Sequence, residues 1–351
     1  GRHELTRKTR RMTYNVFVTL QGEDRIARYA MDPVTGALAL RDDVTLLGGP
    51  APVAISPDRQ FMHVAQRGSN QLTSFRIGAS DGSLTPLGTI PLGSDPCYLG
   101  MDRTGRFLLG AYYLAEKASV HRIGADGAAQ DPPIEWRTTG RGAHCFQTDR
   151  ANRFAFVPHI EGNGAPNAIF QFRFDAETGQ LAPNAPDRFT AAEMLGPRHF
   201  CFHPTLDVIY VSNEQGCSVS VLDFDPNAGT LSHRQTLTTL PSDWEGANKC
   251  AQIRMTPDGR FLYAPNRGHD SIACFAVDDA NGLLTANGNV AAEPVPRAFE
   301  IDPAGRFLLS VGLESGRLAT YRIDGASRGL EPIATEEVGA KPMWVTILPS
   351  D

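Results

Sequence analysis

The sequence predicts an all-β protein, a seven-bladed β-propeller with four-stranded blades whose last blade is assembled from both chain ends. The first observation behind this prediction is a repeat. An apolar residue follows a polar turn at six places along the chain: Phe61, Phe107, Phe154, Val208, Phe261 and Phe307. The separations are 46, 47, 54, 53 and 46 residues. A period of this size without helical periodicity is typical of propeller blades.

The second observation is that each repeat contains four short strand patterns in a fixed order. The innermost strand is apolar, as in PRHFCFHP (197–204), and a turn with Pro, Asp and Gly follows it. The second strand is apolar, as in FLYAP (261–265), and the third alternates with period 2, as in IACFAVD (272–278). A further Asp/Gly turn leads to a short outer strand, as in GLLTANG (282–288).

The third observation concerns the two ends of the chain. Six whole repeats leave a half-unit at each end: residues 13–47 supply the three outer strands of a blade, and residues 342–348 (PMWVTIL) supply an innermost strand. Joining them closes the ring and removes two exposed sheet edges. We therefore expect one propeller domain over residues 12–351. Residues 1–11 (GRHELTRKTRR) are basic and polar, and we interpret them as a disordered or vector-derived leader.

Composition and charge narrow the classes of partner. The net charge is −6, which gives no global attraction to nucleic acid or to an anionic membrane. The sequence has no apolar run of 18 residues and no signal-peptide pattern. Its six cysteines lie far apart without zinc-ligand spacing, and we expect free, mostly buried thiols in a reducing compartment, the cytoplasm. We expect no metal and no cofactor. The oligomeric state is not predicted.

Strand direction predicts which polar side chains meet. The innermost strand and its neighbour run antiparallel, so the start of one and the end of the other lie at the same mouth of the central channel. Starts of innermost strands supply His144, Arg198 and Arg297, and ends of second strands supply Arg67, His159, Glu214, Arg267 and Glu314. Arginines, histidines and carboxylates on one rim indicate an anion-binding site with acid–base groups.

Two other motifs predict no site. GASDG (78–82) matches the nucleophile pattern GxSxG, but it falls in a hairpin turn without the helix that a nucleophile elbow requires. DFDPNAG (223–229) partly matches a calcium loop, but Ala228 stands where the sharp turn needs glycine. We interpret both segments as turns.

Several of these segments resemble the β-propeller lactonase family, which includes bacterial propeller-type 6-phosphogluconolactonase and the fungal 3-carboxy-cis,cis-muconate lactonizing enzyme. The similarity covers residues 12–351, and its most specific part is GPRHFCFHP (196–204) followed by VSNEQ (211–215). Further similar stretches are MTPDGRFLYAPNR (255–267), VPRAFEIDPAGRFLL (295–309) and KPMWVTI (341–347). The resemblance implies catalytic roles for His144, Arg198, Glu214 and Arg267, and the rim position adds Arg67, His159 and Arg297 as substrate-binding candidates.

The resemblance implies a metal-independent lactonase that acts on a small anionic sugar-acid lactone. Glu214 or His144 would act as general base and the other as proton donor, while Arg198 and Arg267 would bind the oxyanion and an anionic substituent. Two local differences from the family affect the substrate more than the fold: Cys145 follows the site histidine, and the His159–Asn167 loop looks longer than in the bacterial enzymes.

Two alternative functions are consistent with the same residues. The same four residues could lactonise a muconate, with a general acid delivering a proton to carbon and the arginines holding carboxylates. The propeller could also be a non-catalytic binding module, which would present aromatic or apolar anchors at its mouth. Ionisable groups at the predicted rim favour catalysis.

Overall fold

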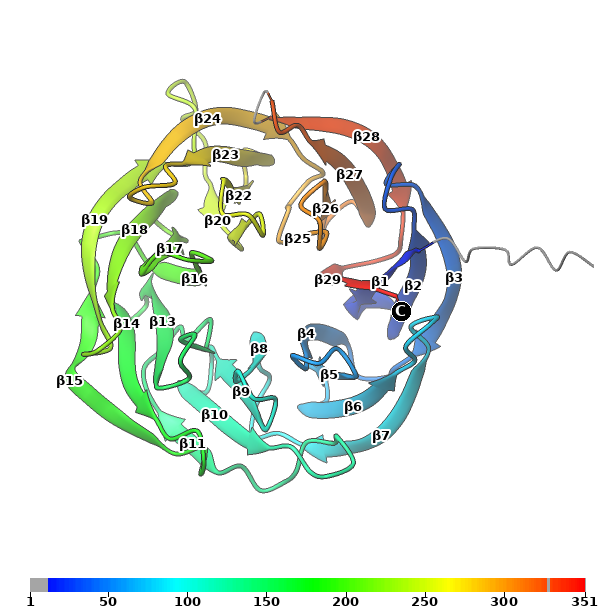
Figure 1. The fold of residues 1–351 in the computed structure, drawn as a ribbon, viewed down its shortest axis with the longest axis horizontal. Helices are drawn as coiled ribbons and strands as arrows, with labels where there is room; N and C mark the ends of the chain where they lie inside the picture. The colour runs from blue at the N-terminus through cyan, green and yellow to red at the C-terminus, as the bar shows by residue number, and fades with distance from the viewer. Residues whose placement is uncertain (1–11, 327–328, 351) are drawn as a thin grey trace, which may run out of the picture.

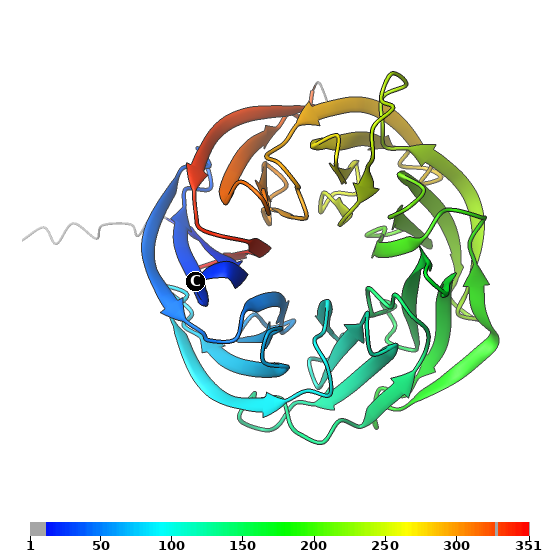
Figure 2. The ribbon, with the colours of Figure 1, turned by 180° about the vertical axis from the view of Figure 1, so that it is seen from behind.

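A computed structural model describes residues 12–326 and 329–350, and its β-sheets form a closed ring of seven blades (Figure 1). In Figure 2 the same ring is seen from behind, with the red C-terminal strand beside the blue N-terminal strands. The predicted all-β, seven-bladed fold is confirmed. The predicted leader, residues 1–11, lies outside the described residues.

We number the blades in chain order and give each from its innermost strand outward. Blade 1 contains β4 (Pro50–Ile55), β5 (Phe61–Gln66), β6 (Gln71–Ile77) and β7 (Leu84–Pro91). Blade 2 contains β8 (Tyr98–Met101), β9 (Phe107–Tyr112), β10 (Lys117–Arg122) and β11 (Glu135–Thr138). Blade 3 contains β12 (Gln147–Thr148), β13 (Phe154–Gly162), β14 (Ala165–Phe174) and β15 (Leu181–Thr190).

The next three blades follow the same order. Blade 4 contains β16 (Pro197–Phe202), β17 (Val208–Asn213), β18 (Ser218–Asp225) and β19 (Thr230–Thr238). Blade 5 contains β20 (Lys249–Cys250) and β21 (Arg254–Met255), which both pair with β22 (Phe261–Arg267), then β23 (Ser271–Val277) and β24 (Leu284–Ala291). Blade 6 contains β25 (Ala298–Ile301), β26 (Phe307–Val311), β27 (Arg317–Ile323) and β28 (Leu330–Glu337).

Blade 7 closes the ring as the sequence predicts. It contains β29 (Pro342–Pro349), β1 (Tyr14–Leu20), β2 (Arg25–Met31) and β3 (Leu38–Thr45), in that order, with a short 3-10 helix at Gln21–Glu23. The C-terminal β29 runs antiparallel to the N-terminal β1, with Val345 opposite Val18 (Figure 1). Side chains from distant parts of the chain are thereby brought around one axis.

The repeated phenylalanine and the repeated turn glycine pack against each other across blade boundaries. A Cβ on Gly36 of blade 7 would lie 2.8 Å from the ring of Phe307 of blade 6, and one on Gly229 of blade 4 would lie 2.1 Å from the ring of Phe154 of blade 3. Both glycines also have positive φ values, which side chains rarely adopt. This packing explains why the two residue types recur with one period.

Burial follows the position of each strand in its blade. Inner strands such as β5 and β17 are buried on both faces because neighbouring blades cover them, whereas outer strands such as β7 expose most of their residues. In the described ranges no helix is long and apolar enough to span a membrane. All six cysteines are free, and four of them are buried.

Candidate active site

Arg198 reaches the channel mouth from a β-bulge. Pro197 pairs with Asn213 and His199 pairs with Ser212, so Arg198 is the extra residue between them. Bulges commonly redirect one side chain near functional sites. The preceding Gly196 has a φ of +71°, and a Cβ there would lie 1.8 Å from Gln215 Oε1, so the chain needs glycine at this turn.

Glu214 lies between two arginines. Its Oε1 lies 3.2 Å from Arg198 Nε, an ion pair without hydrogen-bond alignment, and accepts a hydrogen bond of 2.8 Å from Arg267 Nη2. Its Oε2 accepts a hydrogen bond of 2.8 Å from Gln215 Nε2. Burial alone would raise the pKa of Glu214, but Arg198 and Arg267 hold it below the usual range. Glu214 is therefore ionised and holds the two arginines in place.

Arg297 adds a third cation to this group. Burial, Arg267 and Arg67 lower the pKa of Arg297 to about 10, and burial, Arg267 and Arg297 lower that of Arg198 to about 9. Among the described residues, Glu214 is the one carboxylate that forms ion pairs with any of Arg198, Arg267 and Arg297. The group therefore carries an excess of two positive charges. Arg67 lies beside it but is neutralised by Asp95 at 3.0 Å.

His144 completes the group from the segment that precedes β12. Its backbone N–H donates to the carbonyl of Pro158 on β13, which fixes the segment against blade 3. The ring is buried, and its Nδ1 has no hydrogen-bond partner among the described residues. Burial and then Arg198, His199, Arg297 and Arg267 lower the pKa of His144 well below its ordinary value. His144 is therefore a neutral imidazole beside a cationic cluster.

His159 and Glu314 do not join this group. The second strand of blade 3 extends to Gly162, so His159 still lies inside β13, where Nε2 is hydrogen-bonded to Thr139 Oγ1 at 2.8 Å. Its ring stacks on Phe170 at 4.1 Å between centroids. Glu314 is exposed in a turn. The long loop expected at His159–Asn167 is mostly an extension of the β13–β14 hairpin.

The structure also places three aromatic residues at the site that are absent from the rim predicted by strand direction. The rings of Tyr113 and His199 each lie 5.7 Å from that of His144, and Trp344 lines a small cavity together with Arg198, Arg297 and His199. Tyr113 directly follows β9, so the rule of second-strand ends, applied to blade 2, would have found it. His199 directly follows Arg198 in the motif GPRHF.

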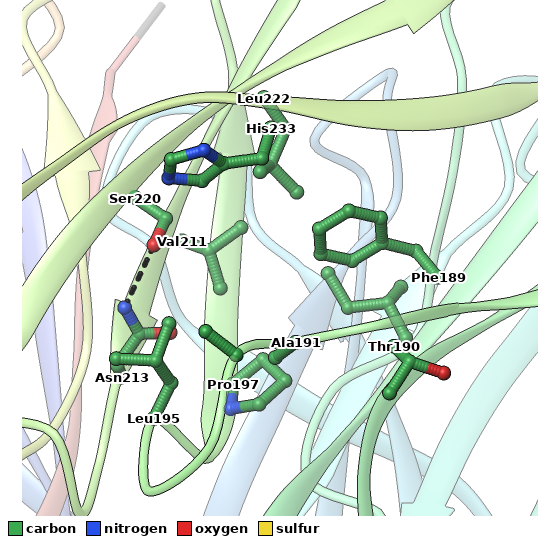
Figure 3. A pocket seen from close by; sticks show the side chains of 12 residues that line it. Phe189, Thr190, Ala191, Leu195, Pro197, Val211, Asn213, Ser220, Leu222 and His233 are labelled. Atoms are coloured by element: carbon green, nitrogen blue, oxygen red, sulfur yellow. Dashed lines mark hydrogen bonds between the residues drawn. The ribbon is translucent and has the colours of Figure 1, made fainter.

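A separate pocket lies between blades 3 and 4 (Figure 3). Its lining is mainly apolar and includes Phe189, Leu195, Val211 and Leu222. Pro197 and Asn213, the residues before Arg198 and Glu214, line it as well, but the arginines themselves do not. The acid–base and cationic groups therefore belong to the channel mouth and not to this pocket.

The arrangement at the mouth matches the needs of acyl transfer to water. Uncompensated guanidinium groups can bind an anionic substituent and the oxyanion of a tetrahedral intermediate, because they are fixed before the reaction begins. A neutral imidazole can take a proton from water. Arg198 Nη1 is buried without a hydrogen-bond partner among the described residues, so it has a donor available for a ligand.

Comparison with known proteins agrees with this geometry. The family described as lactonases with a 7-bladed β-propeller matches residues 13–347. A 6-phosphogluconolactonase of Serratia proteamaculans is 36% identical over 313 residues, 89% of this chain and 92% of that protein. A 6-phosphogluconolactonase of Yersinia pestis is 33% identical over 336 residues, 96% of this chain and 98% of that protein.

Solved structures show the same fold. The periplasmic gluconolactonase of Pseudomonas aeruginosa superposes with a TM-score of 0.88 at 24% identity, over 96% of this chain and 99% of that one. At this identity the likeness concerns the fold alone. The family match and the curated relatives cover nearly the whole chain, and the protein therefore belongs to the lactonase family of seven-bladed β-propellers.

Proposed function

We propose that this protein hydrolyses a sugar-acid lactone that carries a phosphate group, of the 6-phosphogluconolactone class. The observation that carries the proposal is the charge of the mouth: Arg198 and Arg267 share the single carboxylate of Glu214, and Arg297 lies near it without an ion pair of its own among the described residues. Two buried positive charges call for a ligand with nearly two negative charges. A phosphate monoester carries about −1.5 to −2 at neutral pH. The names of the curated relatives support the same substrate class.

We assign the general base to His144. Both carboxylate oxygens of Glu214 are already engaged, Oε1 by Arg198 and Arg267 and Oε2 by Gln215, which leaves this group poorly placed to take a proton from water. Neutral His144 accepts a proton from water as the water oxygen attacks the lactone carbonyl. The arginines then stabilise the tetrahedral oxyanion. When the ring C–O bond breaks, the protonated His144 returns its proton to the leaving alkoxide oxygen.

Neighbouring cations make protonated His144 unfavourable in the free protein, and the substrate offsets this effect. Arg198 and Arg297 both disfavour the imidazolium form. A bound phosphate and the developing oxyanion bring negative charge to the same group of side chains. A lactone without the phosphate would bring less negative charge to these side chains. The phosphate should therefore assist the chemical step as well as binding.

The first prediction therefore compares two lactones that differ in the phosphate. We expect kcat/KM for 6-phosphoglucono-δ-lactone to exceed that for glucono-δ-lactone by about 10²-fold or more, since paired ionic contacts are each worth about 1.5–3 kcal/mol. A pH-indicator assay with correction for spontaneous hydrolysis measures both rates, and a chelator should change neither. Equal rates for the two lactones, or turnover of a carboxymuconate in place of a lactone, would contradict the proposal.

A second prediction follows from the pKa of His144. Because that pKa is lowered, His144 loses its proton at a lower pH than an ordinary histidine, and the base form persists into mildly acidic solution. We expect the acid limb of kcat/KM to lie below the ordinary histidine value of about 6.5. Rates measured from pH 4.5 to 8 check this expectation.

Arg297→Met distinguishes His144 from Glu214 as the group that titrates. Arg297 lowers the pKa of His144 and, through its coupling to Glu214, acts on that carboxyl group in the same direction, but a glutamate freed from the cation returns only toward about 4.3. The variant should therefore move the acid limb upward toward the ordinary histidine value. A limb that stays in place would assign the titration, and the base, to another group.

The same proposal places the protein in the cytoplasm. Six free cysteines, four of them buried, are typical of proteins in a reducing compartment. A phosphorylated sugar lactone is also an intracellular type of metabolite, because its charge prevents it from crossing a membrane unaided.

A further inference from the structure

His199 lies against His144, and it also lines a chamber that His144 does not line. It follows the bulged Arg198 on β16, and its backbone N–H donates to Ser212 Oγ at 3.3 Å. Its side chain is buried, with the ring centroid 5.7 Å from that of His144, 5.5 Å from that of Tyr98 and 6.4 Å from that of Trp344. The two imidazoles are therefore neighbours within a column of rings.

Each of the two imidazoles keeps one buried nitrogen without a described hydrogen-bond partner. These atoms are Nδ1 of His144 and Nε2 of His199. A neutral imidazole has one N–H donor and one acceptor nitrogen, and burying either without a partner costs about 1–3 kcal/mol. Rings at this separation can share a hydrogen bond through one water molecule.

Both rings are neutral at neutral pH. Burial and then Arg198, Arg254 and Arg297 lower the pKa of His199 well below its ordinary value, as burial and the arginines do for His144. The ionisable groups that face His199 are these arginines with Arg267, His144 on the blade 3 side, Tyr98 on β8 and, in the chamber that His199 lines, Glu300. Glu300, the one carboxyl group among them, is paired with Arg254 at 3.5 Å. The partner that orients His144 therefore has to be a neutral group.

A histidine base works through one nitrogen only when the other nitrogen is held as N–H. In many hydrolases a carboxylate accepts that N–H. Here Glu214 is committed to Arg198 and Arg267. The acceptor nitrogen of neutral His199 can take the place of such a carboxylate without adding charge to the site.

We infer that His199 is a positioning residue. Nε2 of His199 accepts the Nδ1–H of His144 through a water molecule, and this contact fixes the tautomer and orientation of the His144 ring. This inference rests on the proposed function, in which His144 is the base. A neighbouring chamber is consistent with this role, because His199 also lines a space of about 290 Å³ with Gln147, Gln252 and Glu300. Water in a polar chamber of this size can hydrogen-bond to the second nitrogen of His199.

Three variants at this position separate positioning from packing. Gln places its carboxamide near the site of Nε2, Asn near that of Nδ1, and Phe keeps the ring without either nitrogen. We expect kcat to fall roughly 10²-fold in His199→Phe and His199→Asn, at the lower end of what a positioned base contributes. His199→Gln should stay within about tenfold of wild type by the same reasoning, with KM little changed in all three.

His63→Gln serves as the matched control, because His63 is also a buried neutral histidine but pairs with Ser74 between β5 and β6. It should leave kcat unchanged. A purely packing role for His199 predicts the opposite order, with Phe the mildest substitution because it preserves the contacts with Tyr98 and Trp344. Full kcat in His199→Phe would overturn the inference.

A spectroscopic readout keeps this test separate from the proposed activity. Long-range ¹H–¹⁵N correlation spectra of histidine-labelled protein report the tautomer of His144 directly. We expect one tautomer, with the proton on Nδ1, in the wild type and in His199→Gln, and a mixture in His199→Phe. An unchanged His144 tautomer in His199→Phe would refute the positioning role, whether or not the wild type hydrolyses a phosphorylated lactone. A changed tautomer without lactone turnover by the wild type would refute only the proposed function.

Discussion

Replacing Arg198 with methionine is expected to lower kcat/KM by about 10²- to 10³-fold while leaving the protein as stable as the wild type or more stable. The loss of rate follows from removing a donor aimed at the oxyanion and the substrate anion. The gain in stability follows from removing a buried charge, since the guanidinium is 2% exposed and lies near two like charges, Arg267 and Arg297. Lowering its pKa to about 9 means that folding disfavours this charge by several kcal/mol.

The remaining contacts explain why the fold should tolerate this change. Glu214 keeps its hydrogen bond from Arg267 when Arg198 is absent, so the carboxylate is not left buried and unpaired. Methionine has a similar length and fills the space with an apolar chain. The measurements are steady-state kinetics with the phosphorylated lactone and urea unfolding of the same preparations.

Arg103→Met is the control with the opposite expected outcome, a loss of stability without a loss of activity. Arg103 donates to the carbonyls of Thr148 and Asp149, and its side chain has no part in the arginine group at the mouth. Its loss should lower the free energy of unfolding by roughly 1–2 kcal/mol and leave the kinetics unchanged. An Arg198→Met variant within tenfold of wild-type activity, or one that unfolds much more easily, would show that Arg198 serves the fold and not the reaction.

The sequence predicts the ring and the convergence of the site for the same reason. The turn motif and the half-units at the two ends identify the blades, and strand direction then predicts one mouth for Arg67, His144, Arg198, Glu214, Arg267 and Arg297. It predicts the same for His159 and Glu314, which do not join the group in the structure. These inferences need only chain direction and periodicity. The catalytic and binding roles of these residues stay predictions.

Three features of the site depend on local geometry that periodicity does not encode. His159 turns toward Phe170 because β13 extends further than the other second strands. Arg198 lies in a bulge, which shifts it relative to its strand neighbours. The contact of Glu214 with Arg267, 53 residues away, depends on how blades 4 and 5 pack side by side. The sequence places these groups near one another without saying which side chains touch.

Replacing Glu214 with glutamine is expected to lower both activity and stability, in contrast to Arg198→Met. The carboxylate forms ion pairs with two arginines and lies near a third, so its removal leaves buried charges without a partner. Breaking a buried pair in this way costs about 3–5 kcal/mol. Glu135→Gln is the matched control, because that carboxylate pairs with Arg137 at 3.2 Å on outer strand β11, away from the arginine group, and should cost about 1 kcal/mol.

The loss of stability should depend on pH and on anions in a specified direction. The pKa of Glu214 is lower in the folded protein than in the unfolded chain, so its contribution is full above the unfolded value and is lost as the pH falls through the folded value. The gap between wild type and Glu214→Gln should therefore shrink below about pH 4.5.

Inorganic phosphate should restore stability to Glu214→Gln more than it stabilises the wild type, because the variant presents a larger excess of positive charge to the same ligand. Urea unfolding of both proteins, with and without phosphate, measures the two effects together. Equal stability of wild type and variant at pH 7, with no response to phosphate, would mean that Glu214 does not hold the arginine group together. The cations at the mouth would then need no anion beside them, and their charge would no longer favour a phosphorylated substrate.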